Sequence, residues 1–70
     1  MAVALMNIGE RRVVKGVRGK DEVIRHLVDM GFVAGAVVEC VADTPGGKIL
    51  LVKGVRVALD RGLASKIMVA

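Results

Sequence analysis

The chain has 70 residues, of which 54% are hydrophobic, and its 11 Lys and Arg residues against 7 Asp and Glu give a net charge of +4. A chain of this length forms one domain, residues 1–70, and this hydrophobicity excludes an intrinsically disordered protein. The single cysteine excludes a disulfide framework and multi-cysteine zinc or iron–sulfur sites. No apolar run approaches the roughly 18–20 residues of a membrane-spanning helix.

The first half of the chain predicts one strand followed by the only convincing helix. The strand is Arg11–Val17, and Gly16 indicates a bend or bulge near its end. The helix is Asp21–Met30, where the first aspartate either caps the N-terminus or places a carboxylate in the first turn. Gly31 follows directly and is typical of a left-handed helix end. The expected apolar stripe of this helix consists of Val23, Ile24, Leu27, Val28 and Met30.

The second half of the chain predicts five further short elements. Apolar side chains recur at every second position of Val55–Leu59, the fourth predicted strand, so that Val55, Val57 and Leu59 are expected to point inward. The predicted elements are the strands Ala36–Ala42, Lys48–Val52 and Val55–Leu59, a helical turn over Asp60–Ser65, and a final strand, Ile67–Val69.

Two tight turns connect these strands. In Thr44–Gly47, Pro45 occupies the second turn position, and Gly46 is expected to adopt the positive φ of a type II turn at the third. Lys53–Gly54 suits a two-residue hairpin, although Asn is more favourable than Lys at its first position.

The predicted fold is mainly β. Five short strands and a single helix cannot cover both faces of a flat sheet, whereas a strongly bent sheet that closes on itself encloses a core and removes exposed edges. We therefore expect a small SH3-like barrel of about five strands, with the α-helix covering one open side and one short helical turn.

The order of residues around the helix end resembles the ferrous iron transport protein A (FeoA) family. The stretch His26–Val38 is similar to the family pattern Leu-x-x-Met-Gly-[Leu/Phe]-x-x-Gly-x-x-Val, and Gly54–Leu59 with Ile67-x-Val69 is similar to its final segment. Together these segments extend the resemblance over roughly residues 7–70. Ala34 departs from the proline that members commonly carry, which should loosen the loop without changing the fold.

The resemblance implies a small cytosolic accessory protein of bacterial ferrous iron transport. In that family, FeoA acts with FeoB, a membrane transporter that carries a cytosolic GTP-binding domain. The apolar opening Met1–Met6 lacks the basic region and length of a signal peptide, which also favours a cytosolic protein without direct membrane insertion. Neither catalysis nor a cofactor is expected, and weak self-association stays open.

No catalytic or metal site is predicted. His26 is interpreted as a solvated helix residue, because a tetrahedral metal site needs three or four ligands. Cys40 lies within an apolar strand and is interpreted as a core residue. Gly46-Gly47-Lys48 resembles the end of a phosphate-binding loop, but the full spacing is absent, and a hairpin turn is the better interpretation.

A partner-binding surface is the remaining candidate site. Apolar residues around the helix end could form a patch with a basic rim, although the core is the default position for Phe32. The predicted surface consists of Arg25, Leu27, Met30, Phe32, Val33 and Arg56.

The alternative function is an RNA- or ribosome-associated basic SH3-like module. Its support is the positive charge and the Gly-rich strand start, Gly9–Gly16. Against it stands the near absence of aromatic residues, because single-stranded RNA is usually read by base stacking on aromatic side chains. A nucleic-acid partner is therefore the less favoured expectation.

Overall fold

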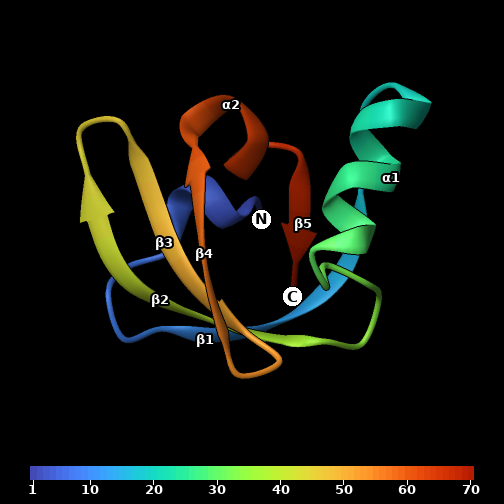
Figure 1. Cartoon of the computed structure of the whole chain (residues 1–70). Helices are drawn as coiled ribbons and strands as arrows, with labels where there is room; N and C mark the ends of the chain where they lie inside the picture. The colour runs from blue at the N-terminus through green and yellow to red at the C-terminus, as the bar shows by residue number, and fades with distance from the viewer.

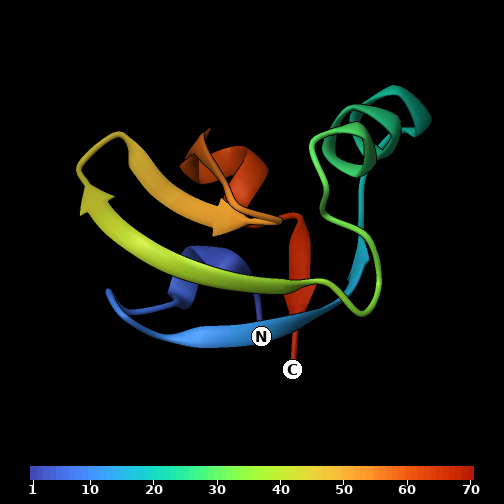
Figure 2. The same ribbon diagram turned by 60° about the horizontal axis from the view of Figure 1, so that its bottom comes forward.

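Five strands form one antiparallel sheet in the order β4-β3-β2-β1-β5. The computed structural model describes all residues, 1–70. The sheet is strongly bent around a central core, with the two termini close to each other beside β5 (Figures 1 and 2). The elements are the 3-10 helix η1 (Val3–Leu5), β1 (Arg11–Val17), α1 (Asp21–Asp29), β2 (Val37–Thr44), β3 (Gly47–Val52), β4 (Val55–Asp60), α2 (Arg61–Ala64) and β5 (Ile67–Val69).

The mainly β, SH3-like architecture expected from the sequence is therefore confirmed. Irregular pairing helps the strands to bend: the register of β1 with β5 shifts between Val14 and Gly16, and that of β2 with β3 shifts between Cys40 and Ala42. The expectation that closure removes every exposed edge was wrong, because β4 and β5 are the two ends of the sheet and do not pair. The short helix α2 makes the connection between them (Figure 1).

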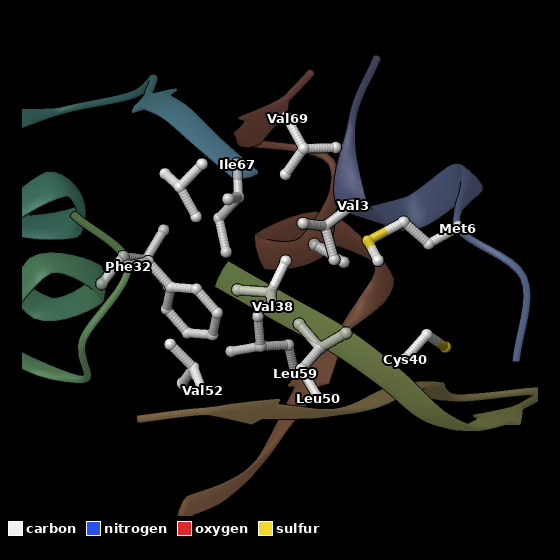
Figure 3. Packing of buried hydrophobic residues seen from close by; sticks show 13 residues of the cluster. Val3, Met6, Phe32, Val38, Cys40, Leu50, Val52, Leu59, Ile67 and Val69 are labelled. Atoms are coloured by element: carbon white, nitrogen blue, oxygen red, sulfur yellow. The ribbon is translucent and has the colours of Figure 1, made fainter. Parts of the chain in front are cut away.

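A single cluster of buried hydrophobic residues fills the space that the sheet encloses. Figure 3 shows Phe32 and Val52 at one end of the cluster, and Met6 and Cys40 at the other. Phe32 is the only aromatic residue of the chain. The cluster consists of Val3, Met6, Val14, Leu27, Phe32, Val38, Cys40, Leu50, Val52, Leu59, Ala64, Ile67 and Val69.

Helix α1 lies at one side of the barrel and buries a single side chain in the core (Figure 2). Of the predicted apolar stripe, only Leu27 is fully buried, and Val28 is 39% exposed. The helix begins after Lys20 without a side-chain cap, so the first aspartate acts only through its charge in the first turn. Gly31, with a φ of 107°, follows the helix end as expected.

Of the two hairpin turns, the sequence predicted the β3–β4 turn correctly and the geometry of the β2–β3 turn incorrectly. Lys53 (φ 51°) and Gly54 (φ 77°) form the expected two-residue turn between β3 and β4. Gly46 does not adopt a positive φ, so the type II geometry expected for the β2–β3 turn was wrong. The essential glycine is Gly47, where a Cβ atom would lie 2.0 Å from the carbonyl oxygen of Leu59.

The inward alternation expected for β4 holds only at the end of the strand that reaches the core. Leu59 is buried and Val57 is half-buried, whereas Val55 is 59% exposed. Val55 follows the turn at the tip of the hairpin, where no core residue covers it. The first residue of β4 is exposed because the strand extends beyond the core there, and nothing covers its inward face.

Candidate partner-binding surface

The outer face of the sheet carries a row of side chains that crosses four strands. The register pairs Arg11 of β1 with Glu39 of β2, Glu39 with Leu51 of β3, and Leu51 with Arg56 of β4. Because side chains directly opposite each other in a sheet point to the same face, these four residues lie side by side on the outside of the barrel.

A shallow depression of about 290 Å³ lies along this row. Its floor is apolar where β2 and β3 meet, and its rim is formed by the charged ends of β1 and by the turn between β3 and β4. We call it the outer-face depression. It is lined by Arg11, Ala36, Val37, Glu39, Leu51, Lys53 and Gly54.

The apolar side chains of this face are exposed to an unusual extent for so small a protein. Val37 is 47% exposed, and its partner across the β1–β2 ladder, Val13, is 42% exposed. The exposed apolar surface of these two paired side chains is suited to contact with another macromolecule.

The charge of this face is positive. Arg11 and Glu39 form an ion pair with 3.7 Å between Nε and Oε1, so they largely neutralise each other. Lys53 and Arg56 have no carboxylate within 4.0 Å, and both are exposed. Lys53 lines the depression, and Arg56 lies beside it, opposite Leu51. This face therefore combines an apolar floor with two free cations, which suits an acidic and partly apolar partner segment.

The structure divides the predicted partner-binding residues into two groups. Leu27 and Phe32 have no exposed surface and belong to the core, so they cannot contact a partner directly; for these two residues the prediction of a surface position was wrong. Arg25 and Arg56 are exposed, and Met30 and Val33 are half-buried, all at or near the surface. The default assignment of Phe32 to the core is thereby confirmed.

The loop after α1 links these residues to the outer-face depression. A Cβ atom on Gly31 would lie 3.6 Å from Val52 and 3.7 Å from the side chain of Lys53, so this loop packs against the β3–β4 hairpin. Ala36, at the end of the same loop, lines the depression. Met30 and Val33 therefore belong to a loop that adjoins the depression.

Glu10, which directly precedes β1, fixes the backbone and a side chain at the start of that strand. Glu10 accepts a hydrogen bond from the backbone N–H of Asn7 at 2.8 Å, and its carboxylate pairs with Arg12. The hydrogen bond from Asn7, followed by that from Arg12, holds the pKa of the Glu10 carboxyl below its ordinary value of 4.5. The backbone beside it is tied to β2, since Gly9 N–H donates to the carbonyl of Cys40 at 2.7 Å.

The comparisons with known proteins give one consistent result. The FeoA domain model matches residues 1–70. The chain belongs to the FeoA family. A candidate Fe(2+) transport protein A of Methanocaldococcus jannaschii is 34% identical over 67 residues, which cover 96% of this chain and 82% of that protein.

Solved FeoA structures share the fold over almost the whole chain. The crystal structure of an iron uptake regulatory protein, FeoA, is 33% identical with a TM-score of 0.92, covering 99% of this chain and 93% of that one. FeoA of Stenotrophomonas maltophilia, a prokaryotic SH3 domain protein solved with zinc, is 28% identical with a TM-score of 0.89, covering 100% of this chain and 89% of that one. The family resemblance predicted from the sequence is thus confirmed.

The other residues considered for chemistry occupy structural positions in this FeoA domain. No three His, Cys, Asp or Glu residues lie close enough together to hold a metal ion. His26 is exposed on α1, whereas Cys40 is fully buried, with its sulfur 3.6 Å from the carbonyl oxygen of Ala42. No helix in the structure combines the length and the apolar character that a membrane crossing requires.

Sequence reasoning missed a buried charge near the turn of the β2–β3 hairpin. Lys48 is only 4% exposed, and its Nζ lies 3.0 Å from Oδ2 of Asp43. Arg61 of α2 reaches the same carboxylate and donates to the carbonyl oxygens of Thr44 at 3.0 Å and Pro45 at 3.1 Å. The signal was present in the alternation of β3, which places Lys48 on the same inward face as Leu50 and Val52.

Sequence reasoning also missed the apolar floor of the outer-face depression. Val37 and Val38 are adjacent, and only one of two neighbours in a strand can face the core. The structure buries Val38 and exposes Val37. This doublet is the signal by which the exposed face could have been found.

Proposed function

We propose that this protein is a cytoplasmic accessory protein of ferrous iron transport, and that it acts by binding the cytosolic GTP-binding part of the membrane transporter FeoB. The observation that carries the proposal is the match of the FeoA domain model to residues 1–70. It is supported by the similarity to Fe(2+) transport protein A and to a FeoA considered a candidate ferrous iron transport activating factor. The protein contributes binding rather than catalysis to this system.

The docking surface in this proposal is the outer-face depression together with the adjoining loop at Met30 and Val33. Val37 and Leu51 supply the apolar contact, and the free cations of Lys53 and Arg56 select an acidic segment of the partner. Apolar anchors surrounded by charged rims are typical of protein–protein interfaces. Arg25 lies on the exposed side of α1 and does not line the depression.

The buried residues Leu27 and Phe32 have an indirect part in this proposal. They fix α1 and the following loop on the barrel, because Leu27 anchors the helix in the core and Phe32 anchors the loop. Substituting either residue would alter the docking surface only by loosening its support. Their effect on binding should therefore follow their effect on stability.

The RNA-binding alternative has less support. Phe32, the only Phe, Tyr or Trp of the chain, is fully buried, so the exposed imidazole of His26 is the one ring left for base stacking. The basic residues could still contact a nucleic-acid backbone, which would give binding that falls steeply with salt. A titration with RNA at low and high salt therefore serves as a parallel measurement.

The test is a calorimetric titration of the purified cytosolic part of FeoB with wild-type protein and with Val37→Asp. A negative charge on the apolar floor should weaken binding by about tenfold or more, since it opposes both the apolar contact and the attraction of an acidic partner. Leu5→Asp is the matched control, because Leu5 is 69% exposed on η1, outside the depression. Thermal unfolding monitors the fold of both variants.

The results of this titration distinguish an error in the proposed docking surface from an error in the proposed function. Wild-type binding that Val37→Asp leaves unchanged would reject the docking surface but retain the partner. A wild-type protein that does not bind the cytosolic part of FeoB would reject the proposed function. Tight, salt-sensitive RNA binding in its place would favour the alternative.

A further inference from the structure

The β4 strand leaves one edge of the sheet open. At the opposite end of the sheet, the N-terminal segment covers β5: Ala2 forms a bridge with Met68, and Met1 and Val69 exchange two backbone hydrogen bonds of 3.0 and 2.7 Å. β4 pairs only with β3, and no turn, loop or cap supplies a backbone hydrogen bond to any of its residues. Open edges of this kind are templates for pairing with another strand.

The hairpin fixes which backbone groups of β4 face this open edge. In a two-residue hairpin, the residues that flank the turn exchange hydrogen bonds, which here are Val52 and Val55. Counting along the antiparallel ladder in steps of two, the N–H and C=O groups of Arg56 and Ala58 and the N–H of Asp60 point away from β3. The C=O of Asp60 faces α2, because Asp60 is the N-cap of that helix. All three residues are exposed.

The side chains at these positions form a self-complementary pattern. If a second copy of β4 runs antiparallel with Ala58 opposite Ala58, then Arg56 lies opposite Asp60 of the second copy, and Asp60 lies opposite its Arg56. Opposite charges directly across an antiparallel pair are stabilising, and like charges are destabilising. The small Ala58 side chain at the centre adds no steric barrier.

The charges that this arrangement would pair are free in the single chain. Arg56 has no carboxylate within 4.0 Å. Asp60 uses Oδ1 to accept the N–H of Leu63 at 2.8 Å, and Oδ2 has no hydrogen-bond or ion-pair partner. On the inner face, the half-buried Val57 would lie beside Leu59 of the second copy and become more completely covered.

We propose that the open edge of β4 is a self-association site, at which two copies join antiparallel around Ala58 and merge their sheets. The occupant is a second copy because Arg56 and Asp60 are complementary to themselves under this two-fold symmetry. Arg56 is common to this site and to the proposed docking surface, but self-association is measured on the protein alone, so the proposal does not depend on the proposed function.

Sedimentation velocity over a wide concentration range, together with amide hydrogen exchange, tests this site. The wild type should dimerise, and the N–H groups of Arg56, Ala58 and Asp60 should become protected as the concentration rises. Arg56→Asp places like charges across both outer pairs and should raise the dimer dissociation constant about tenfold or more. Arg56→Lys should retain the dimer, because it preserves the charge.

Arg25→Asp is the matched control, since Arg25 is exposed on α1 and the charge change is the same. Its dimer dissociation constant should stay within about twofold of that of the wild type. The proposal is overturned if the wild type is monomeric throughout, or if the two Asp variants dimerise equally. It is also overturned if dimerisation leaves the three β4 amides unprotected, because the copies would then join through another surface.

Discussion

Gly47 is the residue at which two strands approach most closely. It pairs with Asp60 at the end of the β3–β4 ladder, and a Cβ atom there would lie 2.0 Å from the carbonyl oxygen of Leu59 and 2.9 Å from the Cα atom of Asp60. Both neighbours are backbone atoms, which cannot rotate away as a side chain would. The absence of a side chain at Gly47 is therefore a condition for the start of α2, because Asp60 is also its N-cap.

We expect Gly47→Ala to lower the free energy of unfolding by about 2–4 kcal/mol, since the β4 backbone must move to admit the methyl group. Gly46→Ala is the adjacent control, because its Cβ would meet nothing within 4 Å and its φ is not positive. That variant should lie within about 0.5 kcal/mol of the wild type. Urea denaturation of both variants measures the difference, and equal losses would contradict the close approach.

Glu10 links stability to pH. Hydrogen bonds from Asn7 and Arg12 hold the pKa of its carboxyl below 4.5 in the folded state, whereas the unfolded chain has the ordinary value. The unfolded state therefore binds more protons at acidic pH. The contribution of Glu10 is fully present above pH 4.5 and is lost as the pH falls through the lower, folded pKa.

Glu10→Gln should consequently destabilise the protein at pH 7, and its deficit should shrink as the pH falls below 4.5. Chemical denaturation of wild type and variant between pH 7 and pH 3 measures this convergence. Glu22→Gln, on the exposed side of α1 and without a side-chain hydrogen bond or ion pair, is the control. A deficit for Glu10→Gln that stays constant with pH would show that its charge is not involved.

Helix α1 has one side chain fully buried in the core of the barrel, and Val23 packs against that core while partly exposed. Leu27 is fully buried, whereas its neighbour Val28 is 39% exposed. Most of the energy that holds a short helix in a protein comes from its packed face rather than from helix propensity. The position of α1, and with it the loop that adjoins the outer-face depression, therefore depends on Leu27.

We expect Leu27→Ala to lower the free energy of unfolding by about 2–5 kcal/mol, which is a large part of the total for so small a domain. Val28→Ala should cost less than about 1 kcal/mol, because its side chain is already partly in solvent. Thermal and urea unfolding of the two variants provide the comparison. Similar losses at both positions would mean that the helix is held by its exposed face as well.

The strands and the helix α1 were predictable because their signals are local, whereas the 3-10 helix η1 was not predicted. β1 and β5 have the predicted boundaries, and the Lys53–Gly54 turn follows from its two residues. The burial within each element was less predictable, because it depends on what lies opposite. The five apolar residues around α1 could not reveal that only Leu27 would be fully buried, with Val23 and Met30 packed against the core but partly exposed. No local pattern shows that Val55 extends beyond the core.

The whole molecule is one bent sheet around one core, and the docking surface that we propose lies on the outer face of this sheet. The sequence predicted a partner-binding surface near the helix end, but it could not separate Leu27 and Phe32, which are buried, from Val37 and Leu51, which line the outer-face depression that we propose as the docking surface. The distinction depends on cross-strand register, which brings Arg11, Glu39, Leu51 and Arg56 into one row from four separate strands. This row of residues cannot be read directly from their order in the sequence.

The buried thiol of Cys40 gives this barrel a built-in reporter. Its sulfur has no access to solvent in the folded state, and the chain has no second cysteine to compete for a reagent. An alkylating probe can therefore react only with molecules whose β2 strand has come away from the core. The speed of that reaction under native conditions measures how often the barrel opens, without any label being introduced.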